Sequence, residues 1–161
     1  MTRPRSASGS QTLSTTHVVA RVGEERFAFG VQDVEAAFDA PCLTPVPLAV
    51  RGLAGELPYR GRTVRAFDAS CLFGVGSPAG ERTGLVFRDG DERLVLLVDD
   101  VEDLADVPFD DLRAIPPGTD GAGVLRGVCL AADGRLVALV QVDAMVALAT
   151  AAARESGEEE P

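Results

Sequence analysis

The 161-residue sequence contains no lysine, no tryptophan and a single histidine, and these absences argue against several functions. Catalysis by a serine–histidine or cysteine–histidine pair needs a positioned imidazole base. The only histidine, His17, follows an irregular N-terminal segment, where we expect no such position. With no tryptophan and only 5% aromatic residues, the chain has few surfaces on which single-stranded nucleic acid could stack. The sequence therefore predicts neither a nucleophilic hydrolase nor a single-strand-binding protein.

Cysteine is also scarce. Cys42, Cys71 and Cys129 are odd in number, far apart, and never in a Cys-x-x-Cys pair. This spacing supports neither a zinc site nor a disulfide framework, so we expect buried, reduced thiols. Neither a phosphate-binding loop nor a dinucleotide fingerprint occurs in the sequence. We therefore predict no catalytic residue, no metal ligand and no cofactor.

No apolar run approaches the roughly 18 residues that a membrane-spanning helix requires. Residues 1–14 contain two arginines but no apolar stretch of the kind found in a secretory signal. We therefore expect a cytoplasmic protein without membrane insertion. The composition predicts a flexible tail over residues 1–14, one domain over residues 15–150, and a helix end with an acidic tail over residues 151–161.

The formal net charge of −10 is unevenly distributed along the chain. Residues 1–65 hold eight arginines and six acidic residues, whereas residues 66–161 hold seven arginines and nineteen acidic residues. A strongly acidic chain is repelled by phosphate backbones, which argues against nucleic acid as a partner.

Short apolar segments separated by turn signals predict an all-β barrel or sandwich. We expect hairpins over residues 18–31, 84–98 and 123–142, with a type I′ turn at Asp89-Gly90 in the second. Residues 31–39 could hold a turn or two of helix. Residues 143–155 have the amphipathic pattern of a helix that Asp143 could cap.

The stretch "LLVDDVEDLADV" (residues 96–107) could be a metal cage, a catalytic pair or the polar face of a bent strand. It lacks the alternating acids and the glycine of a calcium loop, and nothing near it would separate the pKa values of two carboxylates. We favour a structural role, with residues 94–98 buried, a bend at Asp99 and Asp100, and Val101 and Leu104 returning to the core. A small β-barrel enzyme that uses the two aspartates is the alternative of a different class.

Four arginines cluster on and around a loop punctuated by glycine and proline: Arg51, Arg60, Arg62 and Arg65. They could simply be solvated side chains. They could also form a docking surface, because guanidinium groups pair bidentately with carboxylates and arginine is enriched at interface anchors. A basic face and an acidic face would also allow head-to-tail contacts between like folds.

Several stretches occur in the order and spacing of a known family. They are "VARVGEERFAFGVQDVEAAF", "VPLAVRGL", "RGRTVRAFD", "LVDDVEDL" and "VLRGVCLAADGRLVALVQVDAMVAL". Over about residues 18–148 the chain resembles the bacterial chemotaxis coupling proteins, which contain a CheW-like domain. The resemblance implies two intertwined five-stranded SH3-like β-barrels with a C-terminal helix, and no enzyme activity.

The resemblance also implies a scaffold that couples chemoreceptors to a CheA-like histidine kinase in receptor arrays near the membrane. Its partners would be the kinase and the cytoplasmic tip of a methyl-accepting chemoreceptor. The alternative is a stand-alone module of the same fold that competes for kinase or receptor docking in a pathway other than motility. Both functions depend on protein contacts and not on catalysis.

By position, Val34, Gly52 and Arg60 correspond to docking residues of the family, and Val101 falls in its groove-lining strand. We add three neighbouring residues as partner-binding candidates: Gly61, Arg62 and Asp99. An apolar groove of valine and leucine would receive a helix, and charges at its rim would set the register. The chain departs from the family pattern at Ala36, Pro58, Tyr59 and Arg65, which indicates a divergent member with altered partners.

Overall fold

The computed structural model describes residues 14–39, 52–75, 82–108, 112–113, 123–131 and 134–158. Cys42, Arg51 and most of the predicted N-terminal tail lie outside these ranges. In chain order the elements are β2 (Ser14–Val22), β3 (Glu25–Gly30), the 3-10 helix η1 (Val31–Asp33), β4 (Val34–Asp39), β5 (Leu53–Tyr59), β6 (Arg62–Asp68), α1 (Ala69–Phe73), β7 (Thr83–Asp89), β8 (Glu92–Val98), β9 (Asp100–Pro108), β10 (Leu125–Leu130), β11 (Leu136–Val140) and α2 (Val142–Glu158).

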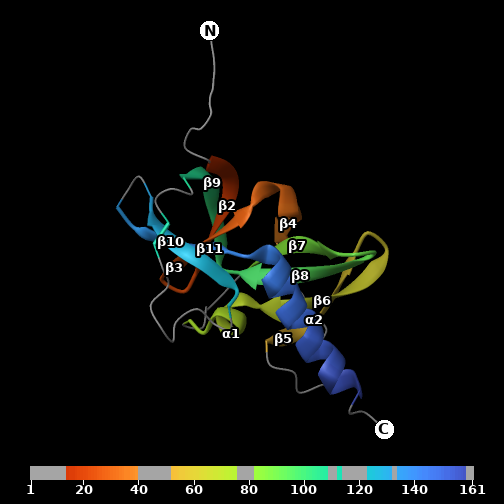
Figure 1. The fold of residues 1–161 in the computed structure, drawn as a ribbon. Coiled ribbons are helices and arrows are strands. Elements are labelled where there is room, and N and C mark those ends of the chain that lie inside the picture. The colour runs from red at the N-terminus through yellow and green to blue at the C-terminus, as the bar shows by residue number, and fades with distance from the viewer. Residues whose placement is uncertain are drawn as a thin grey trace.

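Two five-stranded sheets contain all of these strands (Figure 1). The first barrel has the strand order β10-β11-β3-β2-β9, and the second barrel has the order β4-β7-β8-β6-β5. The chain starts in the first barrel, builds the whole second barrel and then returns to complete the first. The barrels are therefore intertwined, and the predicted all-β fold with a C-terminal helix is confirmed.

The three predicted hairpins are present, but the predicted type I′ turn is wrong. β2 pairs antiparallel with β3, β7 with β8, and β10 with β11. Asp89 still belongs to β7 and lies opposite Glu92, so the turn residues are Gly90 and Asp91. Of these two, only Gly90 has a positive φ, at 63°. A type I′ turn needs positive φ at both of its central residues.

The prediction of helical turns over residues 31–39 is only partly right. Helical geometry is limited to η1, and from Val34 the chain becomes β4, which pairs antiparallel with β7. The register shifts between Val34 and Ala36, so an extra residue bulges out of the ladder there. Pairing with β7 satisfies the backbone polar groups on one side of this edge strand and overrides its weak helical pattern.

The predicted C-terminal helix is confirmed as α2, which packs across both barrels. Met145, Val146 and Ala149 on one face are buried in a core that both sheets share. The Thr150 hydroxyl donates a hydrogen bond of 3.0 Å to the Asp89 carboxylate, which ties the helix to the β7–β8 hairpin. No helix among the described residues has the length and hydropathy needed to cross a bilayer.

Three apolar clusters stabilise the fold, one shared core and one smaller core inside each barrel. Side chains alternate between them, so Val18 and Ala20 face the shared core while Val19 faces the inside of the first barrel. Residues 94–98 alternate in the same way in the second barrel, and all five are buried as predicted. Strands buried on both faces read as continuous apolar runs.

Two predictions about single residues are wrong. His17 was expected near the end of a flexible tail, but it lies within β2 between β3 and β9, with 4% of its surface exposed. Cys71 was expected to be buried, but it is exposed on α1 while its neighbours Leu72 and Phe73 are buried. Cys129 is buried as predicted.

Replacing Met145 by alanine should destabilise the protein by about 2–5 kcal/mol, because the change leaves a cavity in the shared core. Urea denaturation followed by circular dichroism would measure this loss. Ala147→Ser on the exposed face of α2 is the control and should leave the midpoint almost unchanged. A similar small effect for both variants would mean that α2 is not part of the core.

Candidate partner-binding surfaces

The β5–β6 turn presents two arginines at its tip. Tyr59 pairs with Arg62, which leaves Arg60 and Gly61 as the turn residues, with φ of 50° and 79°. Arg60 is the only non-glycine residue with positive φ in the described part of the chain. This conformation costs about 1 kcal/mol or more for a side chain with a Cβ, and such strain is common at functional sites.

A buried glutamate holds the base of this turn. The Glu35 side chain is 8% exposed, and its Oε2 accepts a 2.7 Å hydrogen bond from the Tyr59 hydroxyl. Its Oε1 accepts hydrogen bonds from Arg88 Nε at 2.8 Å and Arg93 Nε at 2.9 Å. The hydrogen bond from Arg88, followed by those from Tyr59 and Arg93, lowers the pKa of Glu35 to about 2.

The same tyrosine closes the second barrel. β4 and β5 are the two edges of that sheet, and Tyr59 on β5 stacks against Phe38 on β4 with ring centroids 6.2 Å apart. Gly84, opposite Phe38, leaves room for that ring, because a Cβ there would lie 3.2 Å from it. Side-chain contacts therefore bring the two edges together at the hairpin that carries Arg60.

A hollow of about 430 Å³ opens beside the turn. Arg60, Arg62 and Arg93 line it together with Tyr59 and Glu35. The Arg60 guanidinium lies 5.3 Å from the centre of the Tyr59 ring, and Arg62 donates a hydrogen bond to the Asp91 carbonyl. Neither Arg60 nor Arg62 forms an ion pair with any residue that the structure describes. We call this hairpin tip, Tyr59 to Arg62 with Arg93, the arginine lip.

Four apolar side chains on or next to the edge strands β4 and β9 are only partly buried. Val34 on edge strand β4 and Val101 on edge strand β9 are half-buried against the shared core. Val31 and Leu104 are 38% and 57% exposed. The expectation that Leu104 returns to the core is therefore wrong, because only Val101 does so. We call these four residues the apolar seam.

The acidic stretch after β8 has a structural role. The Asp99 side chain is 9% exposed, and its Oδ2 accepts hydrogen bonds from Gly23 N at 2.8 Å and Arg21 at 3.2 Å. Glu102 forms a 2.7 Å ion pair with Arg26. These contacts fasten the β2–β3 hairpin to β9. The described residues contain no group of three histidine, cysteine or acidic side chains placed to hold a metal ion.

The remaining sequence-predicted positions separate into two groups. Arg60, Gly61 and Arg62 form one turn, as their spacing suggests. Gly52, by contrast, precedes β5 with φ of 86°, and a Cβ there would lie 3.1 Å from Leu72. Its carbonyl accepts a hydrogen bond from the Asp68 amide. Gly52 therefore supports the turn before β5, and its role in docking stays a prediction.

The positions that depart from the family pattern also have distinct surroundings. Pro58 is exposed on edge strand β5, where its missing amide hydrogen costs no ladder bond. Arg65 is exposed on β6, and Ala36 packs against the core of the second barrel. Among these positions, Tyr59 has a direct role in the arginine lip, because its hydroxyl donates a hydrogen bond to Glu35.

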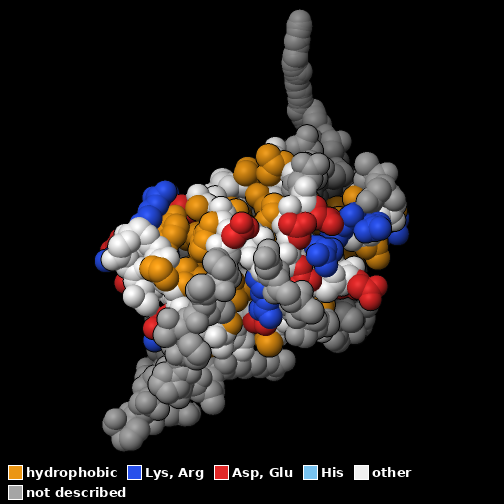
Figure 2. All heavy atoms as spheres, turned by 180° about the vertical axis from the view of Figure 1, so that it is seen from behind, with side chains coloured by type: hydrophobic (Ala, Val, Ile, Leu, Met, Phe, Trp, Pro, Cys, Tyr) orange, Lys and Arg blue, Asp and Glu red, His pale blue; other side chains and the backbone are white. Residues whose placement is uncertain are grey.

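Glu35, Arg88 and Arg93 were not among the predicted site residues. They come from β4, β7 and β8, and no local motif links them. The only signal in the sequence is a glutamate inside an apolar strand segment, which needs a cation or donor as partner when buried. Figure 2 shows the face opposite to that of Figure 1, where acidic and arginine side chains lie among apolar ones.

Comparison with known proteins identifies the family. The model of the CheW-like domain matches residues 16–150. The chain belongs to the CheW-like domain family. A chemotaxis protein CheW of Rhizobium meliloti (strain 1021) is 28% identical over 129 residues, covering 78% of this chain and 83% of that protein.

A solved structure of the same family has a similar fold. The crystal structure of the scaffolding protein TtCheW from Thermoanaerobacter tengcongensis superposes with a TM-score of 0.71 at 18% identity. The match covers 82% of this chain and 87% of that one. The prediction of two SH3-like barrels for this CheW-like domain is therefore confirmed.

Lowering the pH should reduce the free energy of unfolding of the wild-type protein, because Glu35 becomes protonated. Because its pKa is lowered from 4.5 to about 2 in the folded state, its stabilising effect is complete above pH 4.5 and is lost as the pH falls toward 2. Urea midpoints measured between pH 6 and pH 2.5 should fall less steeply for Glu35→Gln than for the wild type. Glu24→Gln on an exposed turn is the control and should keep the wild-type slope.

Tyr59 is the only tyrosine, so its ionisation can be followed by phenolate absorbance without interference. Burial, and then its hydrogen bond to Glu35, raise the pKa of Tyr59 above 10, whereas the charge of Arg60 opposes the rise. Glu35→Gln should therefore lower this pKa and Arg60→Asn should raise it. Shifts of the same sign in both variants would contradict the described network.

Proposed function

We propose that this chain is a non-catalytic adaptor that couples chemoreceptors to a CheA-like histidine kinase in the cytoplasm, at receptor arrays. The observation that carries the proposal is the CheW-like domain match over residues 16–150. The relative from Rhizobium meliloti is a chemotaxis protein by name and TtCheW is called a scaffolding protein, and both names agree with an adaptor. The strained, exposed arginine lip and the apolar seam would supply two separate docking sites.

The arginine lip suits a partner domain with acidic side chains. Two guanidinium groups without ion-pair partners among the described residues stand at one turn, and Glu35 holds the turn in place from below. A guanidinium group forms paired, charge-assisted hydrogen bonds with a carboxylate. Because the turn is already ordered, little conformational entropy is lost when the partner binds. We assign this surface to the kinase.

The apolar seam suits an amphipathic helix. Val31 and Leu104 expose enough apolar surface to gain from burial, while Val34 and Val101 anchor the seam to the shared core. A helix that lies on such a surface presents apolar side chains at intervals of three and four residues. We assign this surface to the receptor tip. An adaptor with two such sites would change kinase activity by binding the two kinase states unequally.

The assignment of surfaces can be tested with two variants. Arg60→Asn combined with Arg62→Gln should weaken binding to the kinase regulatory domain about tenfold or more, because a charge-assisted hydrogen bond contributes about 1.5–3 kcal/mol. Asparagine tolerates positive φ, so the turn should keep its shape and its stability. Leu104→Asp should weaken binding to a receptor-tip fragment and leave kinase binding unchanged. Biolayer interferometry with partners from the same genome would measure both affinities.

Arg135→Gln is a matched control, since it removes an exposed arginine from the first barrel, at the β10–β11 hairpin. It should bind both partners as the wild type does. If the wild-type protein binds neither partner at tens of micromolar, the adaptor function is wrong. If the lip variant keeps full kinase affinity, the adaptor function can stand but the assignment of the lip is wrong.

A further inference from the structure

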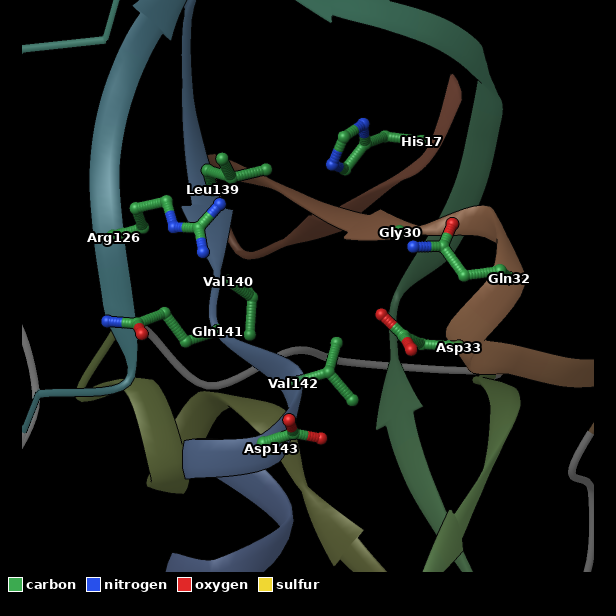
Figure 3. A pocket seen from close by; sticks show the side chains of 10 residues that line it. All are labelled: His17, Gly30, Gln32, Asp33, Arg126, Leu139, Val140, Gln141, Val142 and Asp143. Carbon is green, nitrogen blue, oxygen red and sulfur yellow. The ribbon is translucent and has the colours of Figure 1, made fainter. Parts of the chain in front are cut away.

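A separate polar cavity of about 210 Å³ lies where the first barrel meets the start of α2. Its polar lining comes from β2, η1, β10 and the β11–α2 junction, and consists of His17, Gln32, Asp33, Arg126, Gln141 and Asp143. In Figure 3, Gln32 and Asp33 lie on one wall, Arg126 and Gln141 on the other, His17 above and Asp143 below. The family resemblance assigns no role to these residues.

Gly30 leaves room for the side chains of Gln32 and Asp33, which form one wall of the cavity. A Cβ on Gly30 would lie 2.9 Å from Asp33 Oδ2 and 3.2 Å from Gln32 Nε2. Without that atom, both side chains fold back over the end of β3, next to His17, which pairs with Gly30 across the sheet. The positions of the Gln32 and Asp33 side chains therefore depend on the absence of a Cβ at Gly30.

The opposite wall is held by the start of α2. The Gln141 amide donates to the Val124 carbonyl at 2.7 Å, and its side-chain Nε2 donates to the Gly123 carbonyl at 3.5 Å. This bond uses the donor end of the Gln141 side chain and leaves its carbonyl oxygen as an acceptor. Asp143 lies in the first turn of the helix.

Two of the side chains that line the cavity, Asp33 and Asp143, are carboxylates. Neither Asp33 nor Asp143 forms a hydrogen bond or an ion pair with a side chain in the described part of the chain. Burial raises the pKa of Asp33, the charge of Asp143 raises it further, and the charge of His17 opposes the rise. Arg126 and His17 also line the cavity. The two carboxylates therefore share the cavity, and neither is neutralised by an ion pair within the described residues.

We propose that this cavity binds a guanidinium group, held by the carboxylates of Asp33 and Asp143 and by the side-chain carbonyls of Gln32 and Gln141. A guanidinium ion is planar, has five N–H donors and can bridge several oxygen acceptors at once. The described acidic and histidine side chains are not placed to hold a metal ion, which favours an organic cation. The group could belong to an arginine of a docked protein or to a free arginine-like compound.

His17 supplies an unambiguous reporter because it is the only histidine. The full chain would be titrated with N-acetyl-L-arginine amide while the two imidazole ring resonances of His17 are followed by NMR. The ring resonances should shift and saturate at millimolar concentrations. N-acetyl-L-citrulline amide is a neutral compound of the same shape and should bind at least fivefold more weakly. Equal shifts with both compounds, or no saturable shift with the arginine compound, would overturn the proposal.

Three variants locate the site. Asp33→Asn and Asp143→Asn should each weaken binding at least fivefold, whereas Asp91→Asn, on the exposed β7–β8 turn, should have no effect. Because a variant could unfold, the dispersion of the amide spectrum would be checked for each, and the pKa of Asp33 in the wild-type chain would be measured by carbon NMR. Bound ligand should lower that pKa. Unchanged affinity in both folded variants, or an unchanged pKa, would contradict the site.

The source of the guanidinium group is distinguished by comparing the blocked compound with free L-arginine. Tighter binding of free arginine would indicate a small-molecule ligand, because only it carries charged α-groups. Equal or weaker binding of free arginine would indicate the side chain of a protein. Neither the titration with the blocked compound nor the titration with free L-arginine involves the kinase or the receptor. Their outcome is therefore independent of the test of the adaptor function.

Discussion

Contacts among phenylalanines between the two barrels hold the fold together. Phe27 on β3 stacks on Phe73 of α1 with ring centroids 4.4 Å apart, and Phe29 on the same strand lies 5.5 Å from Phe87 on β7. Aromatic pairs at these distances stabilise a core beyond the area that they bury. Since each barrel alone encloses only a small apolar cluster, the shared core is what keeps the two barrels in one arrangement.

The surfaces proposed for partners depend on this arrangement. The arginine lip extends from the second barrel, whose edge strands are joined by Tyr59, Phe38 and Glu35. The apolar seam includes one half-buried valine from each barrel. Its shape therefore depends on the relative position of the two barrels. The guanidinium cavity likewise forms only where the first barrel meets α2. The shared core therefore positions all three surfaces without contributing a side chain to the lip.

Local patterns were sufficient to predict the class of fold. Alternating apolar residues and glycine turns located the three hairpins, and the amphipathic run after Gln141 located α2. The resemblance to the coupling proteins added the two-barrel arrangement. Predictions failed where neighbours distant in sequence decide the outcome. β4 pairs with β7 despite a weak helical pattern, and His17 is buried because β2 is flanked on both sides.

The sequence by itself determined the three hairpins, the C-terminal helix and the loop that carries Arg60 and Arg62, because each depends on residues close together in the chain. Only the tertiary structure decided the roles of Glu35 and Asp99. A buried carboxylate takes its role from the donors and charges that surround it. For these two residues those groups lie mainly on other strands, such as Arg93 for Glu35 and Arg21 for Asp99. Spacing along the chain carries no information about such distant neighbours.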